Sequence, residues 1–194
     1  MDKIRPFDLP LQLQLEMDNG DFTPYADFYE RRLSQLSNLF ADQAAAAALL
    51  QSNDPLLYDV RSRPFVTSLS DFSFAVTRIY PGKVGDEYHM TRGHFHLLVE
   101  QPEIYLCLRG QGCLLLESGE GDFQAHWWVP GSLSHIPPGY AHRTVNVSNQ
   151  VLVFAAIYHL SAGHDYAKIA QKGFSHLVVE RDGKPVLIPN KNKI

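Results

Sequence analysis

The spacing of apolar residues changes about a third of the way along this chain of 194 residues. Between residues 27 and 40, apolar side chains recur three and four positions apart, which is typical of one face of a helix. Residues 44–50 are strong helix formers, and Asn53-Asp54-Pro55 after them is a stop signal. We therefore expect one or two short helices within the first 60 residues.

Beyond about residue 64 the pattern has a period of two, and β-branched and aromatic residues become frequent. Pairs such as Pro81-Gly82 and Pro130-Gly131 interrupt it at short intervals, as turns do. Many short strands at this spacing are typical of a sandwich or barrel and not of an α/β sheet. The expected strands cover residues 64–69, 74–80, 104–109, 113–117, 123–129, 133–136, 143–147 and 151–158, followed by a terminal hairpin of 177–180 and 185–188.

No internal repeat, low-complexity tract or linker divides the sequence, so we expect a single domain over residues 1–194. The chain is long enough to build a substantial hydrophobic core. Within it we expect a helical amino-terminal segment at 1–60, a barrel core at 61–160, and a carboxyl-terminal extension at 161–194 that packs on the barrel.

The charge and cysteine content exclude some partners. A formal net charge of -4 gives no reason to expect nucleic acid or an anionic membrane as partner. No apolar run is long enough to span a bilayer, and the first residues lack the apolar core of a secretory signal. Cys107 and Cys113 lie in apolar, strand-like contexts, so we expect buried free thiols and a cytoplasmic location.

Four residues have the types and spacings of metal ligands. His94 and His96 are separated by one residue, so on a strand both side chains share one face and can enter one cavity. Glu103 follows a predicted turn, and His142 comes from a separate hairpin. Three imidazoles and one carboxylate can hold Fe(II), Mn(II), Ni(II), Co(II) or Zn(II) and leave positions open for a substrate. The absence of cysteine from this group argues against a structural zinc site.

Five other histidines carry no such pattern. A lone histidine is more often a packed or surface residue than a ligand, and we interpret these residues in that way. They are His89, His126, His135, His159 and His176.

Two motifs in the sequence resemble those of the cupins. The first, with a slightly long inner spacer, is His94-x-His96, six residues, Glu103, six residues, Gly110. The second matches at every fixed position and is Gly131, five residues, Pro137-x-Gly139, two residues, His142, three residues, Asn146. The resemblance implies a mainly β protein, a double-stranded β-helix or cupin jelly-roll barrel, with short amino-terminal helices.

A closer resemblance, over residues 74–180, is to the cupin-type glucose-6-phosphate isomerases. Runs that carry it are Tyr80-Pro81-Gly82, Ala141-His142-Arg143-Thr144-Val145-Asn146 and Gly163-His164-Asp165-Tyr166. It implies a homodimeric isomerase that acts on a phosphosugar in glycolysis and gluconeogenesis. One divalent metal ion per subunit, with Fe(II) preferred, would be bound by His94, His96, Glu103 and His142.

The same resemblance implies a phosphosugar site lined by Thr77, Thr91, Gly93, Tyr105, Tyr158, His164 and Tyr166. Each hydroxyl also has a plainer interpretation. Thr77 and Thr91 suit strands by propensity alone, and Tyr105 and Tyr158 suit a core with a hydrogen-bonded tip. The loop that carries His164 is polar, so a packing role explains it less well than it explains these other residues. Arg92 is given no role.

The expected reaction moves hydrogen between C1 and C2 of the open-chain sugar, with the metal polarising the carbonyl. Glu103 is the implied base, yet a carboxylate bound to a dication is a weak base. Tyr158 or His164 could transfer the proton instead, and a hydride shift is a third route.

Two other classes of function remain open at this stage. An Fe(II) dioxygenase would use the same ligands but would require an apolar pocket. A non-catalytic sugar-binding cupin would have less need of an open metal site. A preference for mannose 6-phosphate is a variant of the isomerase hypothesis.

Overall fold

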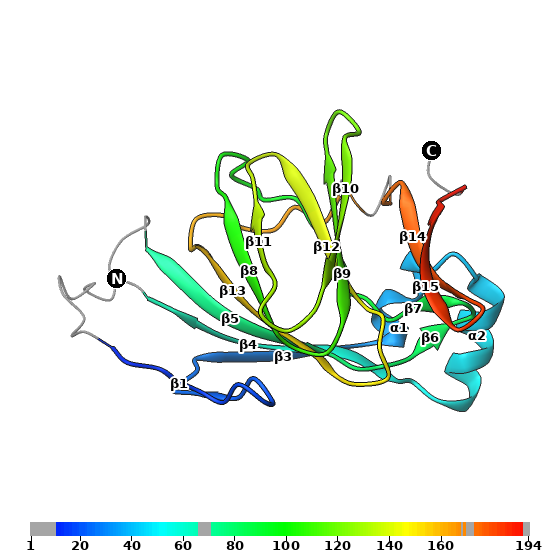
Figure 1. The fold of residues 1–194 in the computed structure, drawn as a ribbon, viewed down its shortest axis with the longest axis horizontal. Coiled ribbons are helices and arrows are strands. Elements are labelled where there is room, and N and C mark those ends of the chain that lie inside the picture. Colours follow the sequence, from blue (N-terminus) through cyan, green and yellow to red (C-terminus); the bar gives the residue numbers. More distant parts are fainter. Residues whose placement is uncertain (1–10, 66–70, 168, 170–172, 192–194) are drawn as a thin grey trace.

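The protein is mainly β, and two antiparallel sheets enclose its interior (Figure 1). The computed structural model describes residues 11–65, 71–167, 169 and 173–191. A six-stranded sheet has the order β11-β8-β13-β5-β4-β3, and a three-stranded sheet has the order β10-β9-β12. One core cluster contains residues of both sheets, Tyr105 and Phe154 from the first and Leu114 from the second. This arrangement confirms the predicted jelly-roll barrel with short amino-terminal helices.

The elements have the following bounds. The six-stranded sheet contains β3 (Asp27–Arg32), β4 (Leu56–Pro64), β5 (Phe72–Ile79), β8 (Glu103–Arg109), β11 (Leu133–Ile136) and β13 (Leu152–His159). The three-stranded sheet contains β9 (Gly112–Ser118), β10 (Phe123–Trp128) and β12 (Tyr140–Asn146). A four-stranded sheet contains β6 (Lys83–Val84), β7 (Glu87–Tyr88), β14 (His176–Arg181) and β15 (Lys184–Pro189). The remaining elements are β1 (Gln14–Leu15), β2 (Phe22–Thr23), α1 (Leu33–Leu36), the 3-10 helix η1 (Ser37–Leu39) and α2 (Gln43–Ser52).

The strands predicted from alternation are confirmed from β5 onward, with ends that differ by a few residues. The terminal hairpin is also confirmed, as β14 and β15. Glu117 of β9 fixes the residue before this hairpin to the barrel, because its carboxylate accepts a 2.7 Å hydrogen bond from the backbone amide of Ser175. Among the described residues, no helix has both the length and the apolar character needed to cross a bilayer.

The helical prediction for the amino-terminal segment is only partly right. Helix α2 is confirmed, and the Asp42 side chain caps it by accepting a 2.8 Å hydrogen bond from the amide of Ala45. Residues 27–32, however, form strand β3, and the helix after them is the single turn α1. The helix-like spacing is overridden because pairing along β4 supplies backbone hydrogen-bond partners to one edge of β3, whose side chains are exposed or half-buried. Of the strand expected at 64–69, Pro64 ends β4, and residues 66–69 lie outside the described part.

A small amino-terminal hairpin, β1 and β2, covers part of the outer face of the large sheet. Phe22 of this hairpin packs in one cluster with Val76 and Val153 of the sheet. Gly20 allows the close approach, because a Cβ there would lie 2.5 Å from the Cγ1 atom of Val153. Its φ of +74° also favours glycine.

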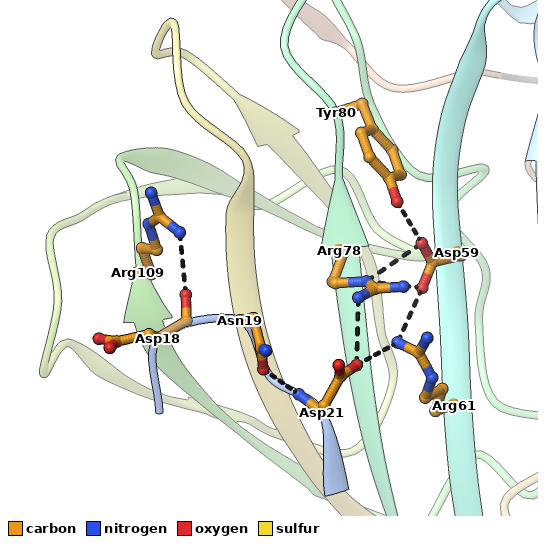
Figure 2. Close-up of polar contacts among 8 residues, drawn as sticks. All are labelled: Asp18, Asn19, Asp21, Asp59, Arg61, Arg78, Tyr80 and Arg109. Carbon is orange, nitrogen blue, oxygen red and sulfur yellow. Dashed lines mark hydrogen bonds and ion pairs between the residues drawn. The ribbon is translucent and has the colours of Figure 1, made fainter. Parts of the chain in front are cut away.

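Ion pairs fasten the same hairpin to the sheet (Figure 2). Asp59 of β4 is buried and accepts hydrogen bonds from Arg78 at 3.0 Å and from the Tyr80 hydroxyl at 2.8 Å. Asp21 of the hairpin lies 2.8 Å from Arg61 and 3.2 Å from Arg78. The two arginines of this outer face are therefore neutralised by two carboxylates.

Candidate metal centre and active-site cavity

The two halves of the ligand group are joined by the backbone. The amide of His94 donates to the carbonyl of His142 at 3.2 Å, and the amide of His142 donates to the carbonyl of His94 at 3.0 Å. Phe95 makes a similar bridge with Asp165. The 94–96 segment is thus held by isolated bridges and not by the regular strand that we expected. The one-residue spacing still brings His94 and His96 to one point, because the backbone is extended there.

The side chains of His94, His96, Glu103 and His142 converge, with one ligand atom from each lying within 4.8 Å of the others. The Glu103 Oε2 atom lies 3.2 Å from His96 Nε2 and 3.1 Å from His142 Nε2. The His94 Nε2 atom is buried and has no hydrogen-bond partner among the described residues. Nitrogen and carboxylate donors with a buried, unpaired imidazole nitrogen fit a divalent cation.

The ring orientation of His96 also suits a ligand. Its Nδ1 atom lies 2.6 Å from the carbonyl oxygen of Gln101 and can only donate to it, which leaves the Nε2 lone pair facing the group. A hydrogen bond of this kind from the second ring nitrogen is the usual support of a metal-binding histidine.

Electrostatics favour the ligating forms of Glu103 and His94, whereas burial acts to lower the pKa of His96 but its contacts with Glu103 and Gln101 hold that pKa above its ordinary value. Burial of Glu103 acts to raise the pKa of its carboxyl, but the neighbouring imidazoles of His142 and His96 outweigh burial and hold that pKa below its ordinary value. Burial, together with the neighbouring imidazoles of His142, His164 and His96, holds the pKa of His94 well below its ordinary value. Glu103 is therefore ionised and His94 neutral at neutral pH, which are the forms that bind a metal.

The inner face of the large sheet forms the wall of a cavity beside this group. Strand alternation selects the residues: Tyr158 of β13 lies directly opposite Glu103 of β8, and Tyr105 lies opposite Ala156. Thr77 of β5 lies two residues before Ile79 on the same inward face. The sheet therefore presents hydroxyl groups next to the ligand carboxylate.

All seven residues predicted for the phosphosugar site lie in this one cavity, together with His94, Glu103 and His142. Thr91 already accepts a 3.0 Å hydrogen bond from the amide of Thr144. The ring of His164 lies 4.2 Å from that of His94 between centroids, and it stacks on Tyr166 at 5.6 Å. The seven residues are Thr77, Thr91, Gly93, Tyr105, Tyr158, His164 and Tyr166. Their roles stay predictions, but their common location is now established.

The cavity lining also contains residues that the sequence interpretation did not name, and three of them have large polar side chains. They are Tyr29 of β3, Tyr58 of β4, and Arg92, which precedes Gly93. A signal for β4 was present, because Tyr58, Val60 and Ser62 alternate with charged residues along that strand. The helical interpretation of the segment before residue 60 hid it.

The five histidines interpreted as packing or surface residues lie outside both the ligand group and the cavity lining. His89 contacts the carbonyl of Tyr80 through Nδ1 at 3.1 Å. His176 stacks on Phe123, and His135 is exposed on β11. The spacing of residues in the sequence thus distinguished these five histidines from the four residues that converge.

A model of the family "Glucose-6-phosphate isomerase (GPI)" matches residues 30–193. The chain is 42% identical over 160 residues to glucose-6-phosphate isomerase of Pyrococcus furiosus, covering 82% of this chain and 85% of that protein. It is 39% identical over 181 residues to the enzyme of Thermococcus litoralis, covering 93% and 95%. The chain belongs to this family of isomerases.

A further relative comes from an organism of another genus. The chain is 37% identical to the glucose-6-phosphate isomerase of Sinorhizobium medicae over 177 residues, 90% of this chain and 82% of that protein. Among solved structures, oxalate oxidase superposes with a TM-score of 0.49 at 15% identity, over 60% of this chain and 58% of its own.

We expect His142→Ala to lower the bound divalent metal sharply, because it removes one of four converging donors. His135→Ala, on the exposed face of β11, should leave metal content near that of the unaltered protein. Metal per chain can be measured by mass spectrometry after desalting. Equal losses in both variants would contradict the ligand assignment.

Proposed function

We propose that the protein is a metal-dependent aldose–ketose isomerase that interconverts glucose 6-phosphate and fructose 6-phosphate. The observation that carries the proposal is that the convergent His94, His96, Glu103 and His142 group borders a cavity lined with tyrosine and threonine hydroxyls. Family membership supports the same activity. A hydroxyl-lined cavity suits a sugar and disfavours the apolar pocket that a dioxygenase would need.

The ligand group would hold one divalent ion per subunit, and we propose Fe(II) for it. Mn(II), Ni(II), Co(II) and Zn(II) accept the same nitrogen and oxygen donors. When bound, such an ion acts as a Lewis acid that polarises the sugar carbonyl and acidifies the neighbouring C–H bond.

The protein must then remove a proton from one carbon and return it to the next. We propose Glu103 as the base, with Tyr158 and His164 as the neighbouring groups that handle the hydroxyl protons. Tyr158 faces Glu103 across the strand pair, and burial raises the pKa of its phenol, so it remains a proton donor. Burial lowers the pKa of His164, which keeps its imidazole neutral beside the ring of His94.

Exhaustive treatment with a chelator should abolish conversion of fructose 6-phosphate to glucose 6-phosphate, and Fe(II) should restore it best. Turnover should be lost because the sugar carbonyl is no longer polarised, while the fold stays intact. A coupled assay measures turnover, and metal content is determined on the same sample. Unchanged turnover after verified metal loss would contradict the proposed chemistry. Better restoration by another ion would contradict only the choice of iron.

Turnover of fructose 6-phosphate in deuterated water should place solvent deuterium at C2 of the product, because a proton held on Glu103 can exchange before it returns. Glu103→Gln keeps the shape of the side chain but removes its charge and basicity, so exchange and turnover should be lost together. Product analysis by mass spectrometry, with metal content measured alongside, tests both. Glu100→Gln, an exposed change nearby, is the matched control.

The outcomes of that experiment separate the possible routes. Product without any deuterium would favour a hydride shift. Exchange that persists in a metal-loaded Glu103→Gln variant would move the base role to Tyr158 or His164.

We also propose that two copies of the chain pair as a homodimer through the outer face of the large sheet. The amino-terminal hairpin covers only part of that face. An exposed apolar strip remains across neighbouring strands, and it contains Phe72, Ile104, Leu133 and Ile157. Such a strip is typical of a surface that another chain covers.

Light scattering at micromolar concentration should therefore give twice the mass of one chain. Leu133→Glu should convert the protein to a monomer without unfolding it, because this side chain is 64% exposed in the single chain. A monomeric unaltered protein would refute the pairing.

The cytoplasm is the compartment that we propose, since phosphosugars of glycolysis and gluconeogenesis are found there. Both cysteines, Cys107 and Cys113, are buried free thiols. This is the usual state of cysteine in a reducing compartment.

A further inference from the structure

The side chain of Arg92 lies in the active-site cavity, although neither the ligand motif nor the proposed proton transfer uses it. Its guanidinium lies 4.6 Å from the centroid of the Tyr166 ring, which itself stacks with His164. Contact with a ring face orients the guanidinium and leaves its N–H donors available at the edge. The sugar cavity therefore contains a positioned cation.

The backbone of Arg92 is held from two sides. Its carbonyl accepts a 2.8 Å hydrogen bond from Arg143, a buried residue whose guanidinium lies 4.6 Å from the ring of Phe174. On the other side, the amide of the preceding residue, Thr91, donates a 2.9 Å hydrogen bond to the carbonyl of Thr144. The position of Arg92 is thus determined by the core beneath it and not by a free loop.

A second arginine acts on the same part of the cavity. Arg31 of β3 lies directly opposite Tyr58 of β4, and its guanidinium lies 4.7 Å from the ring of Tyr29. Burial raises the pKa of Tyr58 to about 12, and the positive charges of Arg31 and Arg92 both oppose that rise. The same two charges oppose the rise at Tyr166. Both guanidinium groups are therefore close to one patch of phenols.

Neither Arg31 nor Arg92 has a carboxylate within ion-pair distance in the described part of the chain. The arginines of the outer face differ, because Arg61 and Arg78 are each paired with Asp21 and Asp59. Arg92 lines the cavity and Arg31 lies against Tyr29, which also lines it, and two uncompensated cations so placed attract an anion. Arginine suits a phosphate in particular, since its planar fork donates two parallel hydrogen bonds.

We propose that Arg92 binds the phosphate of the substrate directly and that Arg31 supplies a second positive charge, so that this arginine pair selects phosphorylated over neutral sugars. The inference rests on the proposed function, because the phosphate of a hexose 6-phosphate lies at the far end of the open chain from the carbons that react. The metal ligands would hold the reacting end, while the Tyr29, Tyr58 and Tyr166 patch would receive the phosphate.

A charge that binds the unreactive end of a substrate contributes equally to the ground state and the transition state. Its loss should raise KM and leave kcat nearly unchanged. We expect Arg92→Gln to raise KM for fructose 6-phosphate by about tenfold or more, since a charge-assisted bidentate contact is lost. Arg31→Gln should raise KM less, by about threefold, because it acts through space. Arg92→Lys should be intermediate, since it keeps the charge but loses the fork.

The experiment is steady-state kinetics on the metal-loaded protein and these variants, with Arg32→Gln as the matched control. Arg32 is the next residue of β3, is exposed, and pairs with Glu30, so its loss changes the net charge equally outside the cavity. The second measurement is competitive inhibition by inorganic phosphate, which should weaken in Arg92→Gln by a similar factor and stay unchanged in Arg32→Gln. If inorganic phosphate inhibited only by binding the metal, its inhibition would be equally strong in all variants.

The results distinguish this inference from the proposed function. An unaltered KM and unaltered phosphate inhibition in Arg92→Gln would overturn the inference while leaving the isomerase intact. A fall in kcat at constant KM would also overturn it, because Arg92 would then act at the reacting end. If the unaltered protein showed no isomerase activity, calorimetric binding of inorganic phosphate that is lost in Arg92→Gln, with metal content preserved, would uphold the anion site and refute only the function.

Discussion

The pair of backbone hydrogen bonds between His94 and His142 is the interaction on which the site depends. It joins an irregular segment before β8 to the middle of β12, which are far apart in the sequence. Because each residue supplies both a backbone partner and an imidazole, the pairing that completes the barrel also brings the ligands together. The Glu103 carboxylate then lies within 3.2 Å of two imidazole nitrogens, and these neighbours offset the cost of burying its charge. Folding and assembly of the ligand group are therefore one event.

The large sheet uses its two faces for different purposes. Its inner face, through Tyr58, Thr77 and Tyr158, lines the cavity with hydroxyl groups. Its outer face is apolar, and the amino-terminal hairpin covers one part of it. The edge strand β3 contributes to both faces, since alternation places Tyr29 and Arg31 on the side of the cavity, which Tyr29 lines, and Phe28 on the opposite side. The amino-terminal segment is thus part of the site and not an accessory to the barrel.

Charges are also separated between these faces. On the outer side, Arg61 and Arg78 are neutralised by Asp21 and Asp59, which fastens the hairpin. On the cavity side, arginine side chains lie on aromatic rings and have no carboxylate partners among the described residues. Ion pairs on the outside contribute to structure, whereas unpaired cations on the inside are available for an anionic substrate.

The sequence by itself determined the fold class and the residues of the candidate metal-ligand group. Alternation and turn residues identified the strands from β5 to β13, because both are local properties of the chain. The spacing of His94, His96, Glu103 and His142 in two motifs predicted a common site, and the structure brings these four side chains together. Tertiary structure alone decided the rest. Residues 27–32 have a helix-like spacing, and only pairing with β4 makes them a strand. The positions of Tyr29, Tyr58 and Arg92 in the cavity follow from that pairing and from the Arg143 contact, which involve residues far apart in the sequence and leave no local pattern.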